Sequence, residues 1–123
     1  MDVVNLDNKL ALIADYWKPH IVGVVNEALV KLVKFTGDFV WHRHDHEDEM
    51  FLVIRGNLRM RTREWGRERE DVIAPGEFII IPRGVDHLPI ADEEVHVLLF
   101  EPATTVNTGN AGGPRTVTEL PRL

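Results

Sequence analysis

Residues 42–56 constrain the fold of this chain more than any other stretch, because they predict an extended segment, a strand and a tight turn in succession. The stretch opens with His42 and His44, which are two residues apart and therefore lie on the same face of an extended strand. An apolar run follows and ends at Gly56, which forms with the next asparagine a strong signal for a two-residue hairpin turn. The stretch therefore predicts β-structure, with two imidazoles side by side.

The remainder of the chain continues this pattern of short β-rich runs separated by turn residues. Residues 58–63 alternate between apolar side chains and arginines, which is typical of a half-buried strand. The mixed-charge stretch 67–70 is best interpreted as a solvated hairpin. The predicted strands are residues 21–25, 28–35, 39–44, 50–54, 58–63, 78–81 and 95–100. Short strands with regular turns predict an all-β fold, either a small barrel or a double-sheet jelly roll.

One short helix is predicted before the strands. Asn5 is a good N-cap, and the helix is expected to continue to about Trp17 before Pro19 ends it. The spacing of four apolar residues places them in one stripe, which we expect to pack against the body of the protein. The stripe consists of Leu6, Leu10, Ile13 and Trp17.

The polar residues of the opening stretch have the donor chemistry of a metal site. Glu49 begins the second strand, and a third imidazole, His87, lies just past a later turn. Imidazoles and a carboxylate are the ligands that first-row transition metals prefer. Glu49 is favoured over Asp48, because strand parity directs Glu49 to the same side as the inward apolar residues. Taken alone, His42 and His44 could equally be polar residues on an exposed strand face.

Two spaced patterns resemble a known family. His42-x-His44-x4-Glu49-x6-Gly56 is similar to the first motif of the cupin superfamily, and Gly76-x5-Pro82-x-Gly84-x2-His87 is similar to the second. The resemblance is to small single-domain cupins, of the type similar to mannose-6-phosphate isomerase. It implies a double-stranded β-helix, or jelly-roll barrel, in which these histidines and the glutamate bind one divalent metal. Fe, Mn, Ni, Co and Zn all suit this ligand set, and the sequence does not choose between them.

Two positions depart from the cupin pattern without touching a ligand. Thr36 stands where the first motif has a glycine, and Ala91 stands where the second motif has an asparagine. The implied ligands are therefore His42, His44, Glu49 and His87. His46 is interpreted as a solvent-exposed loop residue, because acidic residues surround it.

The walls of the implied site are predicted to be largely apolar, with Phe51 and Met60 as candidate lining residues. His96 lies in an apolar run and is either a hydrogen-bonded packing residue or a polar group of the pocket. Four protein ligands leave one or two coordination positions open, which distinguishes a catalytic or ligand-binding site from a structural one.

Three functions are consistent with such a site. The first, which the resemblance implies, is a metal-dependent enzyme that performs redox-neutral chemistry, as an isomerase, epimerase or lyase, on a small sugar- or hydroxy-acid-like metabolite. The second is an Fe(II)-dependent dioxygenase. The third is a barrel that binds a small molecule without catalysis, and it stays open because no general base is evident besides the ligands.

Composition narrows the partners. The formal net charge of −6 argues against a nucleic-acid partner, and no apolar run reaches the roughly 20 residues of a membrane span. There is no cysteine, which excludes disulfides and thiolate ligands, and we expect a cytoplasmic protein. The length predicts one domain over residues 1–123, with a helical start at 1–18, the barrel at 19–101 and an irregular tail at 102–123.

A homodimer is also expected. Met50, Leu52 and Ile54 face away from Glu49, yet they are as apolar as the inward set. A strand that is apolar on both faces must be covered on both. A second copy of the chain would supply that cover, although the opening helix could do so alone.

Overall fold

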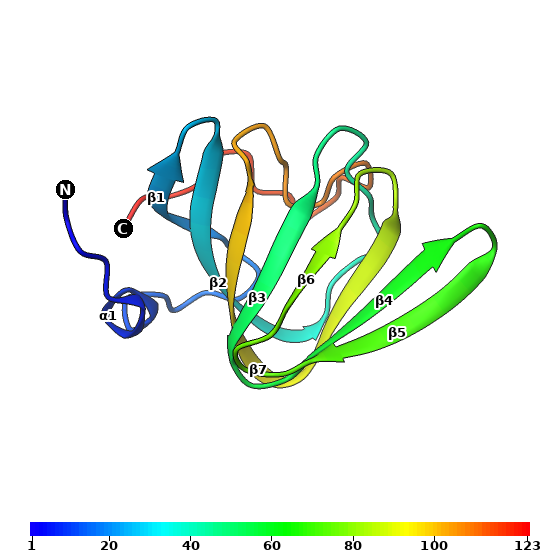
Figure 1. Ribbon diagram of the computed structural model, residues 1–123, viewed down its shortest axis with the longest axis horizontal. Coiled ribbons are helices and arrows are strands. Elements are labelled where there is room, and N and C mark those ends of the chain that lie inside the picture. The colour runs from blue at the N-terminus through cyan, green and yellow to red at the C-terminus, as the bar shows by residue number, and fades with distance from the viewer.

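Antiparallel β-strands make up most of the protein, and a short helix precedes them (Figure 1). The structure is a computed structural model that describes residues 1–123. Its elements are α1 (Leu6–Leu10), β1 (His20–Val25), β2 (Ala28–Asp38), β3 (Glu49–Arg55), β4 (Leu58–Glu64), β5 (Arg67–Ile73), β6 (Phe78–Ile81) and β7 (Asp86–Pro102). The predicted all-β fold with one N-terminal helix is confirmed.

The long strand β7 joins the two halves of the barrel. The main sheet has the order β1-β2-β7-β3-β6, and the β4–β5 hairpin joins it through β4 and β7. The first part of β7 pairs with β4, where His87 lies opposite Thr62. The second part pairs with both β2 and β3, where Leu99 lies opposite Lys31 and Phe51. The strands therefore curl around a common interior, as Figure 1 shows.

Alternate residues of each strand fill that interior. Along β3, residues 49, 51 and 53 are buried while those between them are only partly covered, which is the predicted parity. The hairpin after β3 turns at Gly56, whose φ of 81° lies in the left-handed region. A Cβ there would lie 2.7 Å from the carbonyl oxygen of Glu94, so the turn requires glycine. The main core consists of Val33, Phe35, Phe51, Val53, Leu58, Met60, Ile73, Ile81, Val85, Ala91, Val95, Val97 and Leu99.

The helix is shorter than predicted. It begins after its expected cap, Asn5, whose side chain accepts from the backbone N–H of Asn8, but it ends at Leu10. The carbonyl of Ile13, which a longer helix would pair with Trp17, accepts a hydrogen bond from the Lys34 ammonium at 2.8 Å. Tertiary hydrogen bonds have therefore replaced the last turns of the predicted helix.

The start of the apolar stripe still packs as expected. Leu10 and Ile13 bury themselves against Leu32 of β2, and Leu6 adds to that small cluster. Trp17 leaves the stripe, has a φ of 61°, and packs against the main core instead.

Two other predictions of strands were wrong in extent. Residues 39–44 do not form a strand: only His42 makes a β-bridge, with His87. The last strand was predicted too short: β7 begins at Asp86 and not at residue 95. A proline and a run of three acidic residues lie in this earlier part of the strand, and such residues are more typical of a loop. No helix of the structure has the length and apolar character needed to cross a membrane.

Candidate functional site

The backbone brings the two halves of the site together at one β-bridge. His42 donates its backbone N–H to the carbonyl of His87 at 3.1 Å, and His87 donates back to His42 at 2.8 Å. The loop after β2 is thereby fixed against the start of β7. The side chains of His42 and His87 consequently meet with ring centroids 4.2 Å apart.

Glu49 and His44 complete a compact cluster. Glu49 is the first residue of β3, and its Oε1 lies 3.2 Å from His44 Nε2 and 3.3 Å from His87 Nε2. Taking one donor atom from each of His42, His44, Glu49 and His87, all four lie within 4.8 Å of one another. Each of these residues is at most 4% exposed. The four residues proposed from the sequence thus converge at one buried point, which we call the four-residue site.

The backbone orients two of the imidazoles. His42 Nδ1 lies 2.8 Å from the carbonyl oxygen of Val40, and His87 Nδ1 lies 3.0 Å from that of Val85. A carbonyl only accepts, so each Nδ1 carries the proton and each Nε2 keeps a free lone pair. This outer hydrogen bond to a ring nitrogen is the usual support of a metal-binding histidine.

The third imidazole provides a direct test of whether the site suits a metal. His44 Nε2 is buried and has no hydrogen-bond partner within the protein. A buried polar atom without a partner carries a free-energy penalty of about 1–3 kcal/mol, so native proteins rarely leave one. A cation among three imidazoles and a carboxylate would satisfy it, and this donor set is typical of first-row transition metals. The residues present therefore fit a divalent transition metal.

The electrostatics of the cluster keep two of its donors, His42 and Glu49, in the form that binds metals. Burial, assisted by repulsion from His87, lowers the pKa of His42 to about 4. Burial alone would raise the pKa of Glu49, but the adjacent Glu101, His44 and His87 side chains outweigh it and hold that pKa well below its ordinary value. Near neutral pH the site therefore holds a neutral His42 and an ionised Glu49.

A buried ion pair next to Glu49 was missed by the sequence reasoning. Glu101 accepts a hydrogen bond from the Lys31 ammonium at 2.7 Å, and both side chains are only 2% exposed. Burial and the Glu49 carboxylate raise the pKa of Glu101 well above its ordinary value. Parity was the available signal: Glu101 continues the inward series of β7 that includes Leu99. Glu101 is a polar group of the cavity that the four-residue site does not use.

The cavity beside the four-residue site is small and largely aromatic. Its volume is about 30 Å³. Phe51 lines it, as predicted from the sequence, whereas Met60 lies in the closed core and is not among its lining residues. The lining consists of Trp17, Pro19, Val33, Phe35, Phe39, His42, Glu49, Phe51, Pro89, Leu99, Glu101 and Asn107.

The other two histidines considered in the sequence lie apart from this cavity. His96 points to the opposite face of β7 from Val95 and Val97, and its Nε2 lies 2.7 Å from a carboxylate oxygen of Glu94. It lines a separate surface cavity near α1. His46 is exposed in the loop before β3.

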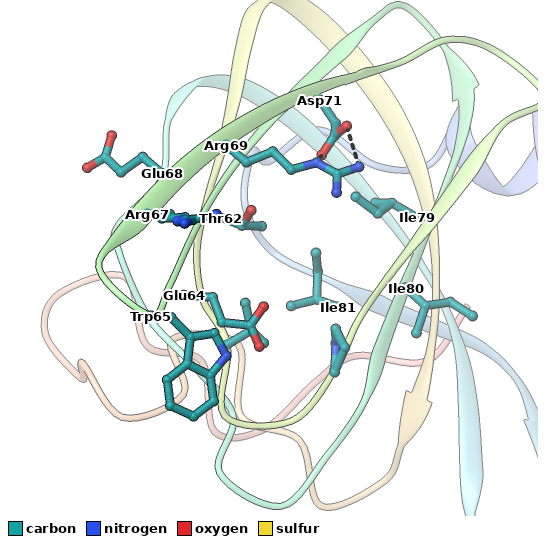
Figure 2. Close-up of a pocket in the computed structure, with 12 residues that line it drawn as sticks. Thr62, Glu64, Trp65, Arg67, Glu68, Arg69, Asp71, Ile79, Ile80 and Ile81 are labelled. Carbon is teal, nitrogen blue, oxygen red and sulfur yellow. Dashed lines mark hydrogen bonds and ion pairs between the residues drawn. The ribbon is translucent and has the colours of Figure 1, made fainter.

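A much larger cavity, of about 730 Å³, lies between the β4–β5 hairpin and β6 (Figure 2), where Thr62 pairs with His87 and Ile81 pairs with Glu49. Ile81 points toward the hairpin and Ile80 points away, while an Arg69–Asp71 ion pair lies on the hairpin side. No histidine lines this cavity, and its charged residues include ion pairs such as this one. It lacks the donor chemistry of the four-residue site.

Comparisons with known proteins agree with this architecture. A protein of Bacillus subtilis (strain 168), the uncharacterized protein YdbB, is 29% identical over 85 residues, which cover 67% of this chain and 73% of YdbB. The crystal structure of a cupin-2 domain containing protein from Shewanella frigidimarina NCIMB 400 has a TM-score of 0.76 and 37% identity, covering 81% of this chain and 94% of that chain.

A more distant structure shares only the fold. Hydroquinone 1,2-dioxygenase from Sphingomonas sp. TTNP3, in complex with 4-nitrophenol, has a TM-score of 0.74 and 20% identity, covering 84% of this chain but 33% of that chain. The family described as "Cupin domain" matches residues 28–101, which hold all four residues of the site. With the barrel, the buried site and this match in agreement, the chain belongs to the cupin domain family.

Proposed function

We propose that the protein holds one divalent transition metal at His42, His44, Glu49 and His87, and that it uses this metal to bind and transform a small ligand. The observation that carries this proposal is the buried, unpartnered Nε2 of His44 beside three further donor atoms. Fe, Mn, Ni, Co and Zn all suit the donor set.

The number of protein ligands supports a functional rather than a structural metal. Three imidazoles and one carboxylate leave one or two positions of a five- or six-coordinate ion open. A metal bound there would supply Lewis-acid polarisation of an oxygen on the ligand. The role of the chain is to keep His42 neutral, Glu49 ionised and the surrounding space free of bulk water.

A ligand with two neighbouring oxygens suits such a site best, since it can occupy two adjacent positions as a chelate. Diols, hydroxy acids and sugars all offer such a pair. We propose redox-neutral chemistry, such as isomerisation, epimerisation or elimination, because a metal held by three imidazoles and one carboxylate can act as a Lewis acid without any redox partner. Glu101 is not one of the four residues proposed to bind the metal, and it supplies a polar group in the same cavity.

The metal requirement of turnover tests this proposal. Metal-free protein is loaded separately with Zn²⁺ and with Fe²⁺ and assayed against diols, hydroxy acids and sugars. Turnover with Zn²⁺ is the expected result. Activity only with Fe²⁺, with oxygen consumed in proportion to substrate, would replace redox-neutral chemistry by a dioxygenase reaction. Metal-dependent binding without turnover would leave a ligand-binding barrel.

The outer face of the main sheet supports a homodimer. Residues of β3, β6 and β7 that point outward form a continuous apolar patch, in which Met50 lies opposite Ile80 on one side and Phe100 on the other. Ile80 is 53% exposed and Phe78 is 59% exposed. Leu10 of α1 and Ile13 cover only the end of this outer face that lies around Ile54. We propose that a second copy covers the patch, because an apolar surface can meet itself across a two-fold axis without charge repulsion.

A further inference from the structure

The cavity beside the four-residue site is too small for the ligands proposed above. Its volume of about 30 Å³ suffices for about one or two water molecules. Small-molecule sites in proteins typically occupy roughly 300–1,000 Å³. A ligand therefore reaches the site through this cavity only if part of the cavity wall moves.

Two rings of that wall are firmly held. Phe35 lies on β2 and is 4% exposed. Trp17 stacks on it with ring centroids 4.2 Å apart and planes 17° apart. The backbone N–H of Trp17 donates to the carbonyl of Lys34 at 2.9 Å, and its indole Nε1 donates to that of Thr36 at 2.8 Å. These contacts fix the indole to the sheet.

The third ring, that of Phe39, is held less tightly. Phe39 follows the last residue of β2, and its backbone N–H donates to the carbonyl of Pro89 at 3.1 Å, but its ring makes no hydrogen bond and its side chain is half-buried. Its ring stacks on Trp17 at 4.8 Å with planes 22° apart and meets the ring of His42 edge-on at 5.3 Å. If the Phe39 side chain turned toward solvent, it would leave a flat, ring-sized space between Trp17 and a residue of the four-residue site.

The chemistry around that space selects the ligand. Asn107 lines the cavity, and its amide already makes two hydrogen bonds: Nδ2 donates to the carbonyl of Arg115, and Oδ1 accepts from the N–H of Val117. Outside the four-residue site, Glu101 is the lining side chain with a buried oxygen, Oε2, that has no hydrogen-bond partner. A sugar would bury several hydroxyl groups without partners, whereas an aromatic diol would bury only two.

The solvent side of the space also favours an electron-rich ring. The guanidinium of Arg115 lies 5.7 Å from the centroid of Phe39 and 5.5 Å from that of Trp17. A cation in this position is attracted to an aromatic face, and more strongly when the ring is electron-rich, as a phenol is.

We propose that Phe39 occupies the place of a planar aromatic ligand, whose ring stacks on Trp17 while a pair of adjacent oxygens reaches the four-residue site. Trp17 and Phe39 are then the residues that determine specificity. This inference rests on the proposed metal site and narrows its ligand class to aromatic compounds with neighbouring hydroxyl or carboxyl oxygens.

Two diols with the same oxygen pair test the inference: catechol, which is planar, and cis-1,2-cyclohexanediol, which is puckered. The full chain is loaded with redox-inert Zn²⁺, and binding of each diol is measured by calorimetry. Because catechol is also the better chelator in solution, the quantity compared between variants is the ratio of the two affinities. Ring stacking contributes about 2- to 12-fold in affinity. Trp17→Leu should lower the ratio of catechol affinity to cyclohexanediol affinity by that factor. Trp17→Phe should keep most of the ratio of the unaltered protein.

The second variant predicts a gain rather than a loss. Phe39→Ala vacates the ring space in advance, so catechol should bind about 2- to 12-fold more tightly than to the unaltered protein. A direct readout follows in a Trp41→Phe, Trp65→Phe background, where catechol should quench the fluorescence of Trp17 and cyclohexanediol should not.

Metal content and thermal unfolding are measured on the same samples. A chain that holds zinc but shows the same affinity ratio after Trp17→Leu, and no gain after Phe39→Ala, overturns this inference and leaves the metal site standing. A chain that takes up no metal overturns the proposed function, and the inference with it. Should Trp17→Leu fail to fold, the gain expected for the half-exposed Phe39→Ala decides alone.

Discussion

The stability of the metal-free protein should fall as the pH is lowered, chiefly through His42. This imidazole is 3% exposed and lies against His87, and its pKa is lowered to about 4 from an ordinary 6.5. Between these two values the unfolded chain binds a proton at His42 that the folded chain does not. Lowering the pH therefore favours unfolding, and the contribution is complete above pH 6.5 and lost as the pH approaches 4. The difference between the two pKa values corresponds to about 3 kcal/mol in the free energy of unfolding.

Denaturant unfolding at several pH values between 7 and 4, with a chelator present, measures this loss. The comparison variant is His42→Asn, whose amide can still donate to the carbonyl of Val40 but does not titrate. His46→Asn is the matched control, because His46 is exposed in the loop before β3. Between pH 7 and pH 4, the free energy of unfolding should fall by about 3 kcal/mol more in the unaltered protein and in the His46 variant than in the His42 variant.

Equal pH dependence in the unaltered protein and His42→Asn would refute the reasoning. It would mean that His42 titrates near its ordinary value and is not desolvated as its burial requires. Saturating Zn²⁺ should move the loss of stability to lower pH, because metal and proton compete for the same nitrogen.

Three further predictions concern packing and assembly. Lys31→Met should lower the free energy of unfolding by about 3–5 kcal/mol, since it leaves Glu101 buried and unpaired, and adding Glu101→Leu should restore most of it in denaturant unfolding. Gly112→Ala should lower the free energy of unfolding by about 1–2 kcal/mol, because its φ of 62° disfavours a residue with a Cβ. Gly109→Ala also places its Cβ against the backbone of Arg43, next to His44, and should weaken zinc binding in calorimetry. Ile80→Asp should convert a dimer to a folded monomer in light scattering; a monomeric unaltered protein would contradict the proposed interface.

The sequence predicted which four residues lie together better than it predicted the path of the chain between them. The spacing of His42 and His44 suggested a strand, and the structure has a loop instead. Both side chains still reach one point, because an extended loop alternates its side chains much as a strand does and the bridge to His87 fixes its position. Parity along β3 similarly identified Glu49, since local periodicity survives errors in the boundaries of elements.

Features that depend on distant contacts were not predictable in this way. The helix stopped early because Lys34, from another element, takes the carbonyl of Ile13. The Lys31–Glu101 pair joins two strands seventy residues apart in the sequence, and nothing local identifies the partner of either charge. The closed aromatic wall likewise requires Trp17 and Phe39 to meet, which only the folded chain reveals.

Metal content tests the account most directly. Protein purified without a tag is stripped, loaded in turn with Mn²⁺, Fe²⁺, Co²⁺, Ni²⁺ and Zn²⁺, passed through a desalting column and analysed for metal and protein. The account predicts about one ion per chain for the unaltered protein and for His46→Ala, with at least one of these metals. It predicts less than about a tenth of an ion for His87→Ala, in the same assay and with a folded chain. Full occupancy in His87→Ala, or no metal in the unaltered protein, would contradict it.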